Sequence, residues 1–154
     1  MTFFELRTPT DMLAKAHREH ARLRESLDID NVFNFFVTAH HIQDYLRGTG
    51  MVPQTALDAF LQDQDMQDAR DMCNKGKHLR LTRGGRGDTS TAIWSGTLNS
   101  APLNTLPLNS TKERWVVFNG ARTFDVEALA DRVMAKWDAF FAVNGLQHAS
   151  TVKP

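Results

Sequence analysis

The sequence has almost no cysteine and no long apolar run, and each shortage excludes a class of protein. Cys73 is the single cysteine in 154 residues, which excludes an internal disulfide and a cysteine-rich zinc module. No segment approaches the roughly 18 consecutive apolar residues that a membrane-spanning helix needs. The first residues lack a basic segment followed by an apolar stretch, so secretion is unsupported. We therefore expect a reducing, cytoplasmic setting and no membrane partner.

Net charge is also absent, because 18 lysines and arginines balance 18 aspartates and glutamates. Bulk charge therefore gives no argument for a nucleic-acid partner, and only a local basic patch could provide one. Apolar residues make up 42% and charged residues 23% of the chain, which is typical of globular proteins and excludes wholesale disorder. We expect a single domain over residues 1–154, large enough to fold without a disulfide.

Motifs that would indicate a specific chemistry are missing as well. The sequence contains no phosphate-binding loop ending in Gly-Lys-Ser/Thr, no His-Glu-x-x-His, no Gly-x-Ser-x-Gly and no EF-hand loop. His17 and His20 have a spacing that can hold a metal ion on one helix face, but a site needs a third and a fourth ligand. Because His20 lies in an apolar stripe, a histidine packed between helices is the simpler interpretation. We expect no metal and no cofactor.

Apolar residues recur at three- and four-residue steps over much of the chain, which predicts amphipathic helices. Thr8, Pro9 and Asp11 form a capping sequence for the first of them. Asp30 and Gly48 are expected to bound the second, whose apolar residues fall nearly all round and mark it as the central helix. The expected helices span residues 8–28, 31–47, 53–62, 64–78 and 125–143.

Over residues 79–124 the spacing of apolar residues changes from the helical period toward the two-residue period of strands, which predicts a β-rich segment. Asn119 and Gly120 form a favoured two-residue hairpin turn, with strands expected on either side. Asp125 then caps the last helix, which ends near Gly145 and has the widest apolar face in the chain. The sequence thus predicts a mainly α (α+β) fold, a helical bundle with a small antiparallel sheet inserted before its final helix.

Polar residues on the apolar central helix are the first candidates for a site. His40, Asp44 and Arg47 recur at helical spacing, and His41 lies on a neighbouring stripe. Polar groups on such a helix are costly unless they are hydrogen-bonded, so one stripe is expected to meet polar partners or a water-filled cleft. The alternative is a histidine satisfied within its own bundle.

The fourth helix offers such partners. Arg70, Asn74 and His78 recur every four residues on one stripe, with Lys75 and Lys77 beside them. Arginine and lysine bind phosphate oxygens, and neutral histidine can take the proton of a ribose 2′-hydroxyl. These groups suffice for RNA cleavage without a metal if the scissile phosphate lies between them. The same pattern also occurs on solvated helix ends that have no catalytic role.

Three segments of the sequence resemble uncharacterised bacterial helical proteins similar to the HEPN superfamily. They are Phe33–Tyr45, Ala69–His78 and Trp137–Phe141. The resemblance implies a bundle of about four or five helices that is frequently dimeric. Many members are ribonucleases of toxin–antitoxin or phage-defence systems that use an arginine and a histidine near a helix end. The implied partners are RNA, a second copy of the chain, and an antitoxin or other protein.

The resemblance also implies roles for individual residues. His78 would be the general base, Arg70 would stabilise phosphate charge and Asn74 would orient the reacting groups. The supporting or binding residues would be His40, His41, Asp44, Lys75 and Lys77. Seven residues separate Arg70 from His78, against four to six in the family's pair. Two alternatives stay open: a non-catalytic interaction or oligomerisation module in which these groups form a buried network, and a small-molecule enzyme built on His40 and His41.

Overall fold

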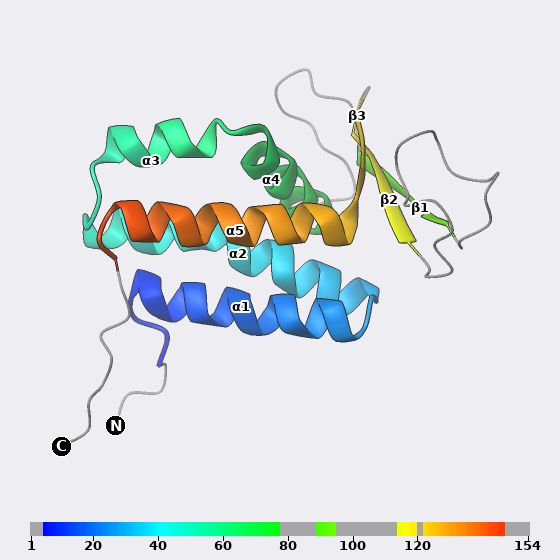
Figure 1. The fold of residues 1–154 in the computed structure, drawn as a ribbon, viewed down its shortest axis with the longest axis horizontal. Coiled ribbons are helices and arrows are strands. Elements are labelled where there is room, and N and C mark those ends of the chain that lie inside the picture. Colours follow the sequence, from blue (N-terminus) through cyan, green and yellow to red (C-terminus); the bar gives the residue numbers. More distant parts are fainter. Residues whose placement is uncertain (1–4, 78–88, 95–113, 120–121, 147–154) are drawn as a thin grey trace.

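Five helices and a small sheet make up the described part of the chain (Figure 1). The computed structural model describes residues 5–77, 89–94, 114–119 and 122–146. The elements in chain order are α1 (Pro9–Glu25), α2 (Ile29–Thr49), α3 (Gln54–Leu61), α4 (Gln64–Lys77), β1 (Thr89–Trp94), β2 (Arg114–Asn119), β3 (Arg122–Asp125) and α5 (Val126–Val143). The fold is therefore mainly α, with a small antiparallel sheet before the last helix, as the sequence predicts.

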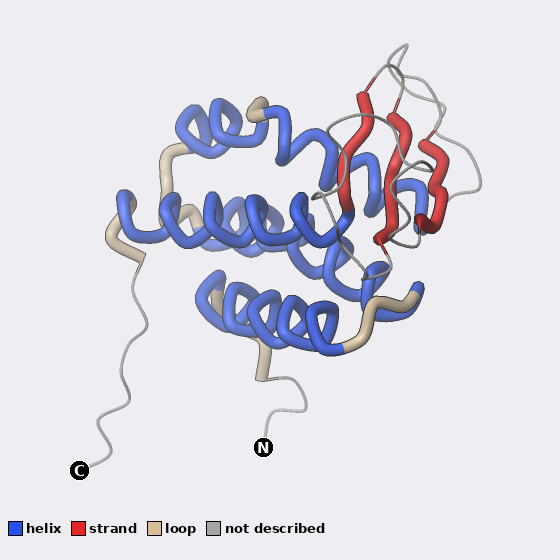
Figure 2. Tube along the Cα trace, turned by 45° about the vertical axis from the view of Figure 1, so that its right-hand side comes forward, coloured by secondary structure: helices blue, strands red, loops and turns tan. Residues whose placement is uncertain are grey.

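Helix α2 is the centre of the bundle, since it contacts α1, α4 and α5. The sheet lies at one end of the bundle, where α5 begins and α4 ends (Figures 1 and 2). Strand β2 packs on α5, and β1 contacts α4. None of the described helices is long and apolar enough to cross a membrane.

One apolar core joins all the layers. Phe35 and Phe36 of α2 are almost completely buried and meet edge to face, with ring centroids 5.0 Å apart. The predicted apolar face of α5 is buried along its whole length. Its members are Val126, Leu129, Ala130, Val133, Trp137, Phe140 and Phe141. Phe33, also on α2, remains 38% exposed, so this helix is not covered all round.

Two predicted helix starts and one predicted stop are confirmed. Thr8 Oγ1 accepts a hydrogen bond from the Asp11 backbone at 3.1 Å, and the Asp11 carboxylate accepts one from the Thr8 backbone at 2.9 Å. Asp125 caps α5 by accepting from the Ala128 backbone at 2.9 Å. Gly145, just past the end of α5, has a φ of 67°, the left-handed conformation that commonly ends a helix.

The start of α2 differs from the prediction. Asp28, rather than Asp30, caps this helix, because its carboxylate accepts a hydrogen bond from the Asn31 backbone at 2.9 Å. The helix consequently begins at Ile29, and α1 has already ended at Glu25. Aspartate makes a good cap at either position, so local sequence alone did not choose between the two.

The end of α2 differs too, because the helix continues through Gly48 and stops at Gly50. Gly50 has a φ of 62°, and its N–H donates to the Leu46 carbonyl at 3.1 Å. Neither glycine has a neighbouring atom within 4 Å of an added Cβ. Substitution effects at both positions should therefore come from backbone conformation alone.

We expect Gly50→Ala to lower the free energy of unfolding by about 1–2 kcal/mol, the cost of a left-handed alanine. Gly48→Ala is the matched control, and its helical backbone should make it stabilising by about 0.4–1 kcal/mol. Denaturant melts of the two variants measure this difference. Equal effects of the two substitutions would contradict the assignment of Gly50 as the helix stop.

The sheet has the order β1-β2-β3, with both pairs antiparallel. Asn119 pairs with Arg122, so Asn119 belongs to β2 and the prediction that it forms the turn is wrong. Cross-strand pairing extended the strand by one residue beyond the point where turn propensity would have ended it. The predicted strand over residues 79–82 lies outside the described residues.

Candidate functional site

A polar cleft of about 170 Å³ lies between α2, α3 and α4. Most ligand pockets have roughly 300–1,000 Å³, so this cleft suits a small group and not a whole drug-sized molecule. Helix α2 provides one wall, and the α3–α4 segment provides the other. The lining residues are His40, Gln43, Arg47, Asp58, Leu61, Gln62, Met66, Gln67 and Arg70.

Hydrogen bonds hold the polar groups of the α2 wall in place. Gln43 is buried; its Oε1 accepts from Arg47 Nη1 at 2.7 Å, and its Nε2 donates to the His40 carbonyl at 3.0 Å. Arg47 Nη2 donates to Asp58 Oδ1 at 3.2 Å, which joins α2 to α3. Asp58 also accepts from Gln54 at 2.8 Å. The Arg47 guanidinium is therefore positioned before any ligand arrives.

Arg70 is the cation that α4 brings to the cleft. Its side chain is 42% exposed, and its Nη2 lies 3.6 Å from Asp71 Oδ1. Its Nε is shielded from solvent and has no hydrogen-bond acceptor among the described residues. Met66, which is buried, and Leu61, which is partly buried, add an apolar surface to the same cleft. Two guanidiniums and an imidazole against one carboxylate make this cleft suitable for an anion.

The structure brings together three of the residues predicted for a site. His40 and Arg47 of α2 line the same cleft as Arg70 of α4. Asn74 and Lys75, further along α4, are half-buried and are not among the lining residues. The side chain of Lys77, and the whole of His78, lie outside the described residues. The predicted stripe on α4 can therefore be followed from Arg70 only as far as Lys75.

His41 and Asp44 form a pair of their own. His41 Nδ1 lies 2.5 Å from Asp44 Oδ2, one helical turn along α2. The His41 ring also meets the His40 ring edge to face, with centroids 5.4 Å apart. Neither His41 nor Asp44 lines the cleft, so the contact with His40 is what connects this pair to it.

The two histidines of α1 contact carboxylates of α5. His17 Nε2 lies 2.7 Å from Asp138 Oδ1, and His20 Nε2 lies 2.6 Å from Asp131 Oδ1. The His20 ring also packs against Phe35. Within the described ranges, no three His, Cys, Asp or Glu side chains gather as a metal site would require. These histidines join α1 to α5.

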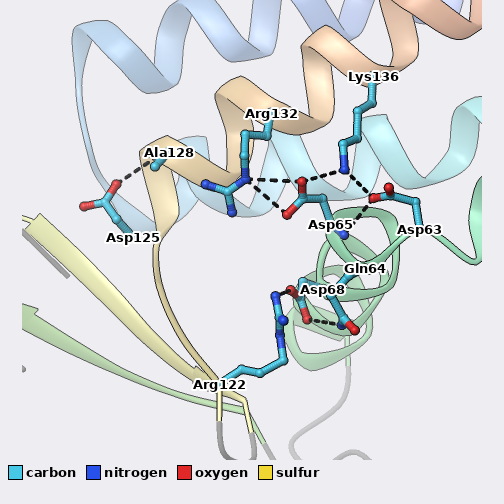
Figure 3. A network of polar contacts seen from close by, with 9 residues as sticks. All are labelled: Asp63, Gln64, Asp65, Asp68, Arg122, Asp125, Ala128, Arg132 and Lys136. Atoms are coloured by element: carbon cyan, nitrogen blue, oxygen red, sulfur yellow. Dashed lines mark hydrogen bonds and ion pairs between the residues drawn. The ribbon is translucent and has the colours of Figure 1, made fainter. Parts of the chain in front are cut away.

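The sequence reasoning missed an acidic face on α4 that is buried against α5 (Figure 3). Asp65 is paired with two cations of α5, since Arg132 Nε lies 3.1 Å from its Oδ1 and Lys136 Nζ lies 2.8 Å from its Oδ2. Lys136 Nζ also lies 2.6 Å from Asp63 Oδ1, at the start of α4. This network fixes the position of α4, and with it Arg70, relative to α5.

A second contact of the same face joins α4 to the sheet. Asp68 is fully buried, and its Oδ2 accepts from Arg122 Nη2 of β3 at 2.7 Å. Asp71, one turn further on, is also buried. The signal was present in the sequence as Asp65, Asp68 and Asp71 at three-residue spacing. This spacing does not by itself identify a buried face, because acidic residues at the same spacing also occur on solvated faces.

These contacts shift the pKa of Asp65. Burial raises the pKa of this carboxyl, but the hydrogen bonds and charges of Lys136 and Arg132 outweigh burial and hold the pKa below its usual value. A lowered pKa in the folded state contributes stability above the unfolded pKa, near 4, and this stability is lost as the pH falls through the folded pKa.

We therefore expect Asp65→Asn to lower the free energy of unfolding by about 1–3 kcal/mol at neutral pH, the range for hydrogen bonds to charged groups. The loss should shrink in acid, because wild-type Asp65 is then protonated as well. Denaturant melts at several pH values from neutral downward measure this convergence. Glu25→Gln, at an exposed carboxylate of α1, is the control and should show little change. A loss that is the same at every pH would contradict the ion-pair explanation.

Comparisons with protein-family models, with curated proteins and with solved structures find no match for this chain. The fold and the cleft define a class: a helical bundle with a small anion-compatible cleft between α2, α3 and α4.

Proposed function

We propose that this protein is a HEPN-like RNA-binding protein that cleaves RNA without a metal ion. The observation that carries the proposal is that Arg70 of α4 lines one cleft with His40 and Arg47 of α2. Guanidinium groups bind phosphate oxygens strongly, and an imidazole can exchange a proton near neutral pH. The toxin–antitoxin or phage-defence setting and the cytoplasmic location belong to the same proposal.

The proposed reaction uses the ribose 2′-hydroxyl as nucleophile. His78 accepts the hydroxyl proton, the 2′-oxygen bonds to the adjacent phosphorus, and the bond from phosphorus to the 5′-oxygen breaks. The leaving 5′-oxygen takes a proton, for which His40 in the cleft is a candidate donor. Arg70 stabilises the negative charge that develops on the phosphate, and Asn74 orients the groups. Lys75 and Lys77 bind flanking phosphates.

The experiment is an RNA cleavage and binding assay with and without EDTA. Wild type should cleave RNA equally in both, and Arg70→Ala should weaken RNA binding by about tenfold or more, the range for a lost charge-assisted hydrogen bond. Arg18→Ala, an exposed arginine of α1, is the matched control and should behave as wild type. An absence of both cleavage and binding, or activity that EDTA abolishes, would contradict the proposal.

A second candidate is the non-catalytic interaction module, which a different observation favours. Ile29 is 65% exposed, and Phe33, one turn further along α2, is 38% exposed. Apolar groups at this spacing are suited to a helix-packing partner, either a second copy of the chain or an antitoxin. In this case light scattering should give twice the 17.4 kDa chain mass, or a complex with that partner. RNA cleavage by wild type would decide against this candidate.

A further inference from the structure

We infer that the cleft between α2, α3 and α4 is a binding site for one phosphate-sized oxyanion, held between Arg70 and Arg47. The chemistry is shared by inorganic phosphate and by a terminal phosphate on a larger molecule. The inference rests on the proposed function in placing an RNA phosphate in this cleft. It goes further by naming the group that should bind there without the rest of the RNA.

The size of the cleft sets the first limit on the ligand. A volume of about 170 Å³ has room for several water molecules or one compact charged group. Leu61 and Met66 close part of the cleft with apolar surface. A base and a ribose would therefore lie outside while the phosphate enters.

Arg70 has a shielded donor that an anion in the cleft could pair. Its Nε is shielded from water and has no acceptor among the residues that the structure describes, although buried N–H groups are normally paired. The side chain as a whole is 42% exposed, and Nη2 lies 3.6 Å from Asp71 Oδ1. A turn of the side chain toward an anion in the cleft would give this donor an acceptor. The unpaired state thus favours reorientation when an oxyanion binds.

Arg47, in contrast, requires no reorientation to bind an anion. Gln43 and Asp58 already hold its guanidinium at the opposite wall, with contacts of 2.7 and 3.2 Å. An arginine that is fixed beforehand loses little side-chain entropy when it binds a ligand. One fixed and one adjustable guanidinium can therefore close on a single tetrahedral anion.

The test is calorimetric titration of the full chain with inorganic phosphate, with chloride at matched ionic strength as the background. Wild type should bind phosphate, and Arg70→Ala and Arg47→Ala should each weaken binding about tenfold or more. Arg70→Lys keeps the charge without the forked donors and should bind more weakly than wild type. Arg18→Ala should bind as wild type does, and thermal melts check that each variant is folded.

Titrations with further ligands distinguish free phosphate from the terminal phosphate of an RNA as the bound group. Sulfate should compete with phosphate and acetate should not, and a short RNA with a 5′-phosphate should bind this site better than the same RNA with a 5′-hydroxyl. Phosphate binding without any RNA binding would support this inference while contradicting the proposed function. RNA binding that depends on Arg70, in a protein that binds no phosphate, would overturn this inference alone. Equal weakening by Arg18→Ala would overturn it as well.

Discussion

Trp137→Ala is expected to lower the free energy of unfolding by about 3–5 kcal/mol, as the loss of a large core aromatic does. The Trp137 side chain is completely buried on α5. Its ring centroid lies 4.8 Å from that of Phe60, a contact that joins α5 to α3, and 6.0 Å from that of Phe140 on the same helix. Denaturant melts measure the loss. Trp137→Phe should cost less, because it keeps most of the ring contact and removes an indole N–H that has no acceptor among the described residues.

The central helix offers a matched pair for the same measurement. Phe36 is 1% exposed and Phe33 is 38% exposed, although they lie only three positions apart. Phe36→Ala should cost about 3–5 kcal/mol, and Phe33→Ala should cost much less, because solvent already reaches the Phe33 ring. Similar losses in the two variants would show that Phe33 is covered in solution, as it would be at the interface of the predicted homodimer.

His78→Ala is expected to lower the rate of RNA cleavage about 10²–10⁴-fold, the usual contribution of a general base. The loss should appear with EDTA present as well as without it, because the proposed reaction uses no metal ion. Single-turnover assays on a defined RNA measure the chemical step. His17→Ala is the control, since His17 of α1 is paired with Asp138 of α5 and does not line the cleft.

Stability measured on the same proteins separates the two functional hypotheses. A catalytic His78 can be removed with little change in the free energy of unfolding. If His78→Ala or Asn74→Ala instead unfolds the protein by several kcal/mol and wild type cleaves no RNA, the α4 stripe is a structural network. The interaction module is then the correct function.

The sequence predicted part of the candidate site. His40 and Arg70 could be selected because a polar group on an apolar helix, or an arginine at regular helical spacing, is visible from local pattern alone. Gln43 and Asp58, which hold Arg47 in place, gave no comparable signal, since glutamine and aspartate are ordinary on exposed helix faces. Gln43 lies one turn before Arg47 on α2, whereas the role of Asp58 depends on α3 lying beside α2.

The starts of α1 and α5 and the apolar face of α5 were determined by the sequence itself. Thr8 and Asp125 cap their helices through backbone groups three residues away, and the buried stripe of α5 follows from a local period. The choice between Asp28 and Asp30, or between Gly48 and Gly50, depended on where the preceding and following chain segments had to pack.

Only the tertiary structure decided which charges are paired and where a cleft forms. Asp65 is paired with Arg132, 67 positions away, and Asp68 with Arg122, 54 positions away. Local periodicity can place such residues on one face of a helix, but it cannot determine which other element will pack against that face. The desolvation of a charge and the partner that offsets it depend on helices that become neighbours only when the core has formed.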